Sequence, residues 1–469
     1  MAAPKKGSNR VKGNLKPSSS SQAALLMGQS TGFIGFGGQS SPSFVPLSSM
    51  LEDVDSSLDA DVRLVLRKLS KKDSTTKIKA LQELSDLSQQ KDTEVLKSML
   101  PFWPRLYNRL SMDVDCKVRE AVNNTFLVVS VRVGKEIAPY LKSIMGCWIA
   151  SQCDTYPIVA FSAIKVFQNT FPGNKQNDAL TLYRQEIVDF LVDNLINQTP
   201  QSLSDPKTTD QVEMDSKYSR VIASSLAGCR KLFTSVAEGK LSSLDSSLTE
   251  LFENGKFWKH SKSTVPGIKG GFYSFLAVIC QRFQELATKY ASKITPIVLH
   301  NLDISNPVIV APMWEAILSL VNHVPECWKH VSWQKAFWPK LRKNLENGFD
   351  GNAASISLNL MPLLSKIPES AVEDQDGFYI EFLSAFRKGF NEDSVLNSAS
   401  DCAALVKSFV ECCQYLIVQA GKREDQELAE KILDQFLVEI VKSAILDEKP
   451  TLASSPVFSC VASLMESFE

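Results

Sequence analysis

A repeated spacing of aspartate constrains the fold of this chain more than any other feature of its sequence. An Asp, four further residues and then a β-branched aliphatic residue recur along the chain, with spacings of 40 and 41 between the first three aspartates. The four occurrences are Asp73 with Ile78, Asp113 with Val118, Asp154 with Val159, and Asp303 with Val308. A period of this length is typical of stacked helical units that bury their apolar faces against their neighbours. We expect each Asp to lie in the turn between paired helices and cap backbone amides there, and each aliphatic residue to begin the buried face of the second helix.

The segments around these turns have the periodicity of amphipathic helices, with apolar residues at i, i+3, i+4 and i+7. In the first segment these residues are Val62, Val65, Leu66 and Leu69. The motif Phe-Trp-Pro occurs at residues 102–104 and again at 337–339, where Pro suits the first turn of a helix. These patterns predict an all-α fold, a HEAT/armadillo-type α-solenoid over residues 51–469. Units of about 40–47 residues would number nine or ten, and we expect an acidic loop between repeats at 199–216.

The first 50 residues differ in composition from the rest of the chain. They are rich in Ser, Gly, Pro and Gln, and they contain no Asp or Glu. Their basic residues are Lys5, Lys6, Arg10, Lys12 and Lys16. Because such a segment cannot bury enough apolar surface to offset its ordering entropy, we predict a disordered, basic N-terminal tail. The whole chain has a net charge of -1, which excludes a uniformly basic nucleic-acid coat and makes any electrostatic function local.

The cysteines and the apolar runs indicate a soluble, reduced protein of the cytosol or the nucleus, with no membrane association, and we expect the cytosol. The ten cysteines show no regular framework. The N-terminal apolar run at 23–27 is too short for a signal peptide, and no stretch approaches the roughly 18 apolar residues of a membrane-spanning helix. We expect reduced cysteines buried as small hydrophobic residues.

Two patterns could carry chemistry, and each has a simpler explanation. Ser30 lies in a Gly-x-Ser-x-Gly sequence, the spacing of an esterase nucleophile, but it lacks the strand and helix that such a nucleophile needs. His323, Cys327 and His330 have the spacing of one helical face, but Pro325 should break that helix, and no Cys-x-x-Cys pair completes a zinc site. We therefore expect no catalytic residue, metal site or cofactor in this chain, and we keep an esterase using Ser30 as a remote alternative.

Two groups of residues are candidates for binding a partner. In the tail, Phe33, Ile34 and Phe36 could anchor in a partner's pocket, or could be chance aromatics in an inert linker. Seven basic residues cluster in the first helical pair: Arg63, Arg67, Lys68, Lys71, Lys72, Lys77 and Lys79. They form either a solvated helix face or, with the adjoining tail, a surface for RNA phosphates.

Several segments together resemble the N-terminal region of the listerin family of E3 ubiquitin ligases. In the tail these are Arg-Val-Lys-Gly-Asn-Leu-Lys-Pro at residues 10–17 and Gly-Phe-Ile-Gly-Phe-Gly at residues 32–37. The similarity continues at residues 65–73, 138–143, 151–156, 203–206, 256–259 and 280–282. It spans essentially the whole chain, and is most specific in the tail and the first repeats.

The resemblance implies a part in ribosome-associated quality control. The N-terminal HEAT region of this family docks on the large ribosomal subunit carrying a stalled nascent chain, beside a peptidyl-tRNA-binding factor of the NEMF type. In the family, a zinc-binding RING at the far end recruits the ubiquitin-charged enzyme. This chain ends at Glu469 without RING-type Cys/His pairs, so we expect a monomer that binds without transferring ubiquitin, and that could compete with the full-length ligase.

The ribosome or its quality-control factor would then meet the tail and the first helical pair, with rRNA phosphates among the contacts. The candidate binding residues are Arg10, Lys12, Asn14, Lys16, Phe33, Ile34, Phe36, Arg67, Lys68, Lys71 and Lys72. A HEAT scaffold or nuclear-transport-type adaptor, which would bind protein cargo, remains the alternative.

Overall fold

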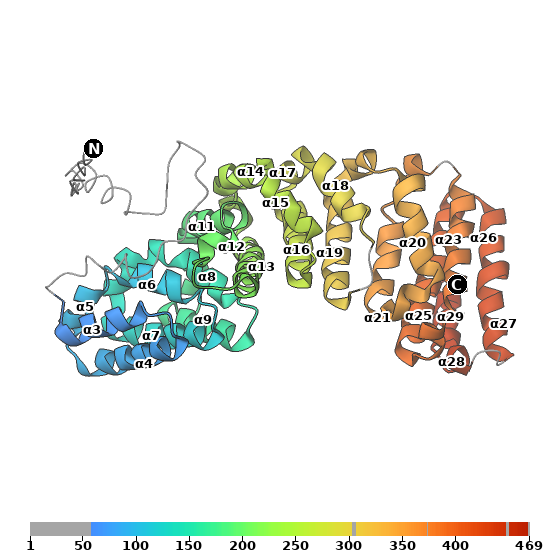
Figure 1. Ribbon diagram of the computed structural model, residues 1–469. Coiled ribbons are helices and arrows are strands. Elements are labelled where there is room, and N and C mark those ends of the chain that lie inside the picture. The colour runs from blue at the N-terminus through green and yellow to red at the C-terminus, as the bar shows by residue number, and fades with distance from the viewer. Residues whose placement is uncertain (1–57, 303–305, 373, 447–449, 468–469) are drawn as a thin grey trace, which may run out of the picture. The chain divides into compact units, whose positions relative to one another are not determined.

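The computed structural model describes residues 58–302, 306–372, 374–446 and 450–467. The predicted tail lies outside these residues. Every regular element in the described ranges is a helix, and the helices follow one another in short steps along the chain (Figure 1). This confirms the prediction of an all-α solenoid.

The first helical pair forms as the sequence predicts. Asp59 accepts hydrogen bonds from the first turn of α3 (Ala60–Leu69), and Asp73 accepts one from the amide of Thr76 in α4 (Ser74–Gln90). The four predicted apolar residues of α3 are all buried. Helix α3 packs on α4, and α4 packs on α7 (Cys116–Val133), so the first unit buries its apolar face against the second.

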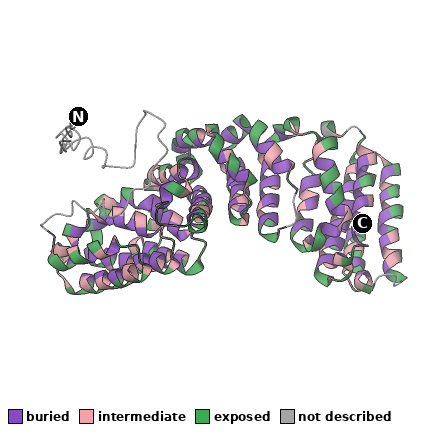
Figure 2. Cartoon of the chain, in the orientation of Figure 1, coloured by how far each residue is buried: buried purple, intermediate pink, exposed green. Residues whose placement is uncertain are grey.

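The next units repeat this arrangement. Their helices are α5 (Thr93–Met99), α6 (Trp103–Leu110), η1 (Gly134–Ser143), α8 (Met145–Gln152), α9 (Pro157–Thr170), α10 (Lys175–Leu182) and α11 (Arg184–Ile196). Helices α4, α7 and α9 pack side by side in one layer, and α6, η1, α8 and α11 pack in a second layer. Buried side chains fill the space between them (Figure 2).

The middle of the chain centres on three long, adjacent helices: α13 (Gln211–Ser235), α16 (Pro266–Arg282) and α19 (Pro307–His323). Two glycines of α16 allow close approach. A Cβ at Gly271 would meet Leu226 of α13 at 3.5 Å, and one at Gly270 would meet the carbonyl oxygen of Val308 at 3.3 Å. The shorter elements here are α12 (Pro200–Leu203), η2 (Glu238–Lys240), η3 (Ser242–Leu244), α14 (Asp245–Glu253), α15 (Gly255–Lys259), η4 (His260–Lys262), α17 (Gln284–Lys289) and α18 (Ala291–Leu299).

The predicted acidic loop at 199–216 was wrong for much of its length. Thr199 and Ser202 form a capping box that starts α12, and Asp210 caps α13 by accepting from the amide of Glu213. Carboxylates are favourable at a helix N-terminus because they complement the helix dipole and bond the free amides. The acidic residues after Asp210 therefore begin a helix.

The C-terminal part continues with shorter and less regular helices. They are η5 (Pro325–His330), η6 (Trp333–Phe337), α20 (Trp338–Glu346), η7 (Gly348–Gly351), α21 (Ala353–Ile356), η8 (Ser357–Asn359), α22 (Leu360–Leu364), η9 (Glu369–Ala371), α23 (Gln375–Gly389), α24 (Asp393–Leu396), α25 (Ala399–Lys422), α26 (Gln426–Ile432), η10 (Leu433–Val438), α27 (Glu439–Ile445), α28 (Pro450–Ala453) and α29 (Val457–Glu466). Both Phe-Trp-Pro motifs place Pro in the first turn, in α6 and α20. Helix α19 ends at His323, which confirms the break at Pro325.

The fourth copy of the aspartate pattern was a wrong prediction. Val118 and Val159 are buried and Ile78 is partly buried, but Val308 is 62% exposed. Because α19 begins at Pro307, Val308 lies in its first turn, and Ile309 and Val310 enter the core instead. Asp303 lies outside the described residues.

Candidate functional site

The repeated aspartates connect neighbouring units through ion pairs. Lys77 of α4 reaches Asp113 before α7, with 2.6 Å between Nζ and Oδ2. Arg119 of α7 reaches Asp154 before α9, with Nε 2.8 Å from Oδ2 and Nη2 3.1 Å from Oδ1. In both cases a cation on one inner helix binds the aspartate of the following unit. The predicted capping is confirmed for all three described aspartates: Asp113 accepts from the amide of Asp115 at 3.0 Å and Asp154 from that of Tyr156 at 2.9 Å, as Asp73 does from Thr76. Asp113 and Asp154 bind these cations in addition.

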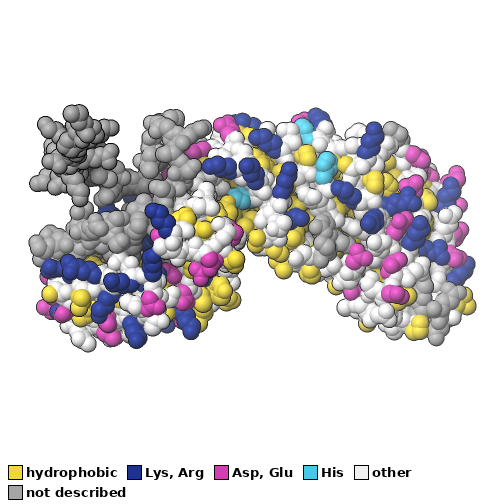
Figure 3. Space-filling view, viewed as in Figure 1, with side chains coloured by type: hydrophobic (Ala, Val, Ile, Leu, Met, Phe, Trp, Pro, Cys, Tyr) yellow, Lys and Arg dark blue, Asp and Glu magenta, His cyan; other side chains and the backbone are white. Residues whose placement is uncertain are grey.

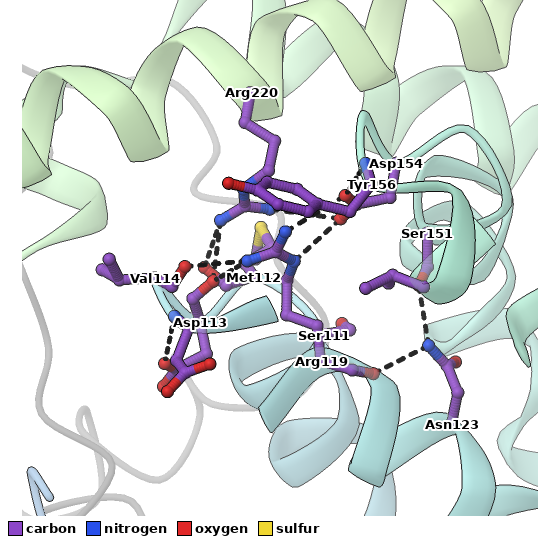
Figure 4. A network of polar contacts seen from close by, with 12 residues as sticks. Ser111, Met112, Asp113, Val114, Arg119, Asn123, Ser151, Asp154, Tyr156 and Arg220 are labelled. Atoms are coloured by element: carbon purple, nitrogen blue, oxygen red, sulfur yellow. Dashed lines mark hydrogen bonds and ion pairs between the residues drawn. The ribbon is translucent and has the colours of Figure 1, made fainter. Parts of the chain in front are cut away.

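Arg220 of α13 joins the same network from about a hundred residues further along the chain (Figure 4). Its Nη2 donates to the carbonyls of Met112 at 3.1 Å and Asp113 at 2.8 Å, and its Nη1 lies 3.6 Å from Asp154. Burial lowers the pKa of Arg220 to about 10, so the guanidinium keeps its charge at neutral pH. Asp154 thus balances two buried arginines and joins α7, α9 and α13.

A buried lysine lies one turn before Arg220. The Nζ of Lys217 donates to the carbonyl of Leu203 in α12 at 2.7 Å. The pKa of Lys217 is lowered to about 7, mainly by burial and in smaller part by the nearby cations Arg109, Arg220 and Lys77, while Asp113 acts in the opposite direction. The α12 to α13 connection is therefore held by a hydrogen bond from a group that is costly to charge.

Replacing Lys217 by Met is expected to raise the free energy of unfolding at pH 7 by about 1–3 kcal/mol. The variant avoids the cost of burying an ionisable amine, and this gain is reduced by the loss of the hydrogen bond to Leu203. The folded-state pKa lies below the unfolded value, so from about pH 7 to pH 10 the unfolded state binds the extra proton. The cost of burying Lys217 is thus greatest below pH 7 and shrinks as the pH rises.

Urea unfolding of variant and parent from pH 6.5 to 8.5 checks this prediction. The quantity of interest is the difference between their free energies of unfolding, because the titration of the cysteines contributes equally to both and cancels. The advantage of Lys217→Met should narrow as the pH rises. The exposed Lys165→Met is the control and should show no such trend. A difference that stays constant or grows with pH would contradict the assignment.

Neutral side chains complete the buried polar groups around the network. Tyr107 donates to Asn123 at 2.9 Å, and Asn123 donates to Ser151 at 3.2 Å. A cavity of about 20 Å³ beside them is lined in part by Cys147 and Arg220. This volume suits about one water molecule and no organic substrate.

Nothing in this network suits a reaction. It holds permanently charged arginines and hydrogen-bonded amides, with no nucleophile beside a base. Within the described ranges, no three His, Cys, Asp or Glu residues gather as a metal site. In the same part of the chain, no helix combines the length and the apolar character needed to span a bilayer. The network therefore serves to fix the units relative to one another.

The predicted basic cluster divides into paired and exposed residues. Lys68 binds Glu83 at 2.7 Å, and Lys77 is taken up by Asp113. Arg67, Lys71 and Lys72 are exposed at the end of α3 and in the turn that follows. They form one small basic surface, and their position at a helix C-terminus also complements the dipole. The tail candidates, from Arg10 to Phe36, lie outside the described residues.

Lys217 and Arg220 were missed by the sequence reasoning. They lie just beyond residue 216, where the expected loop ends. One signal could have found this helix: Asp210 followed three residues later by Glu213 and then by a helical apolar pattern, which marks a helix start. The sequence does not indicate which groups they contact, because Met112 and Asp113 lie more than a hundred residues from Arg220 along the chain.

Comparisons with known proteins identify the family. A family model described as "E3 ubiquitin-protein ligase listerin, N-terminal domain" matches residues 54–367. The listerins of Mus musculus and Gallus gallus are 37% and 38% identical, each over 99% of this chain. The listerin of Drosophila melanogaster is 32% identical over 95% of it.

A solved structure of importin beta aligns with 82% of this chain, and the alignment covers 49% of the importin beta chain, at 10% identity and a TM-score of 0.45. The chain spans about a quarter of the length of the curated relatives, 26% in each of the three listerins. The aligned part is the N-terminal domain of those ligases. The chain belongs to the listerin family of E3 ubiquitin-protein ligases.

Proposed function

We propose that this chain is the part of a listerin-type E3 ligase that binds large ribosomal subunits carrying stalled nascent chains in the cytosol. The observation that supports this most strongly is the match to listerins over 99% of the chain. In this proposal the solenoid and tail supply binding, beside a peptidyl-tRNA-binding factor of the NEMF type. Ubiquitin transfer belongs to a zinc-binding RING, a domain that the family adds outside the matched region.

The contacts with rRNA would be made through phosphates. Arg67, Lys71 and Lys72 are exposed, and they belong to the first helical pair that follows the basic tail along the chain. Lysine and arginine contacts to phosphates release counterions, so their contribution to affinity falls steeply with salt. Such contacts position a protein on RNA without reading its bases.

Co-sedimentation with purified large subunits over a salt series tests the proposal. Changing Arg10, Lys12 and Lys16 to Glu, or Arg67, Lys71 and Lys72 to Glu, should weaken binding by roughly tenfold or more and flatten its salt dependence. The control changes the exposed Lys165, Lys175 and Lys422 to Glu, with the same change of charge. An affinity that changes neither with salt nor with either set of substitutions would contradict the proposal and favour an adaptor for protein cargo.

A further inference from the structure

A second basic region lies in the middle of the chain, far from the tail in sequence. Residues 255–343 contain twelve Lys and Arg residues and four Asp and Glu residues, a net charge of +8, whereas the whole chain carries -1. Nine of these lysines are exposed, and one of them, Lys329, is paired with Glu326 at 2.6 Å. We call the other eight the lysine surface. They are Lys256, Lys259, Lys262, Lys289, Lys293, Lys335, Lys340 and Lys343.

Contacts between consecutive outer helices bring these lysines together. The Nζ of Lys293 in α18 lies 5.5 Å from the centroid of the Trp258 ring in α15, and it donates to the carbonyl of Phe252 at the end of α14. Lys340 of α20 donates to the carbonyl of His300, the residue after α18. Single contacts therefore link α18 to α14 and α15, and α20 to the end of α18. Figure 3 shows basic side chains gathered over this part of the molecule.

The lysine surface is not neutralised by the chain itself. No described carboxylate forms an ion pair with any of its eight members, whereas the nearby Lys329 and Arg342 are paired with Glu326 and Glu346. Glu346 binds both Arg342 and Lys388, and α14 on the other side carries exposed acidic residues. Unpaired like charges on adjacent helices repel one another and destabilise the compact state unless an anion joins them. A bound polyanion would remove this repulsion.

The chemistry of the surface favours phosphate over carboxylate. Bidentate recognition of carboxylates is the strength of arginine, while lysine acts as a point charge toward phosphate. The arginines of this segment are already engaged, Arg282 with the carbonyl of Val236 and Arg342 with Glu346. Lysines distributed over several linked helices suit a polynucleotide backbone, which carries one phosphate for each nucleotide.

We propose that the lysine surface binds the phosphate backbone of RNA, as a second contact besides the tail and the end of α3. It positions RNA without reading bases, because lysine side chains contact phosphates as point charges. The proposal extends the proposed function, in which the RNA is rRNA. It predicts that the two basic regions contribute separately to binding.

The test uses the full chain with Lys256, Lys259, Lys289 and Lys343 changed to Glu. The control carries Glu at Lys165, Lys175, Lys407 and Lys422, which are equally exposed on other helices. Fluorescence anisotropy with a labelled duplex RNA of about 20 base pairs, at several salt concentrations, measures affinity. The lysine-surface variant should bind at least tenfold more weakly, with a shallower salt dependence, and the control should lose less.

Two results would overturn the inference: affinity equal to that of the parent chain or the control, or tighter binding of the parent to polyglutamate than to RNA. All substituted lysines are exposed, so the thermal unfolding midpoint should not fall, which confirms that the variant is folded. Binding to large subunits separates the two proposals. If the parent fails to bind subunits, the proposed function fails. If it binds and the lysine-surface variant binds equally well, the inference alone fails.

Discussion

Replacing Asp154 by Ala is expected to destabilise the N-terminal units by about 3–5 kcal/mol, because it leaves two buried arginines without their carboxylate. The side chains of Arg119 and Asp154 are 0% and 2% exposed, and Arg220 is 9% exposed. Desolvated guanidinium groups with no counter-charge are costly, and the carbonyls of Met112 and Val114 compensate only in part.

Hydrogen exchange measures this effect best, since a solenoid can open unit by unit. Amides of α7, α9 and the N-terminal half of α13 should lose protection in Asp154→Ala, while those of α25 should keep theirs. Asp178→Ala removes an exposed carboxylate from α10 and serves as the control. A loss of less than about 1 kcal/mol in α7 and α9 would mean that the ion pairs contribute little beyond what other contacts supply.

Replacing Trp148 by Ala is expected to cost about 3–5 kcal/mol in the same units. Trp148 is fully buried, and its ring centroid lies 4.7 Å from Phe126 of α7 and 5.1 Å from Phe167 of α9. Its indole nitrogen donates to the carbonyl of Ala163 at 3.0 Å. The substitution therefore removes one hydrogen bond and opens a large cavity between three helices.

Phe161→Ala is the matched control, because this aromatic residue of α9 is 68% exposed and should change stability by only about 0.5 kcal/mol. The measurement is the urea midpoint of the transition that involves α7 to α9. Equal effects of the two substitutions would show that the aromatic core does not hold these units together.

The sequence predicts the helices and their buried faces because these depend on local periodicity. Val62 and Val118 are buried where the apolar pattern places them. The pairing of Lys77 with Asp113 cannot be read in the same way, since it depends on how one unit lies over the next. Val308 fails for a local reason: the start of α19 at Pro307 shifts the buried face by one residue.

The candidate binding residues illustrate the same division. A running charge count over residues 255–343 could have revealed the excess of lysine. Which lysines are exposed, and that contacts link α15, α18 and α20, depends on tertiary contacts such as that between Lys293 and Trp258. Within the first helical pair, the sequence could not separate the exposed Lys71 from Lys77, which is held by Asp113.

The most direct test of ribosome binding compares purified large and small ribosomal subunits. The labelled chain is mixed with each at the same concentration and near-physiological salt, and the bound fraction is measured after sedimentation. If the chain targets the large subunit, its retention on large subunits should be saturable and should be strongest on those carrying a stalled nascent chain. Its retention on small subunits should be low. Equal binding to both would reflect only the affinity of local basic surfaces for any RNA and would contradict the account.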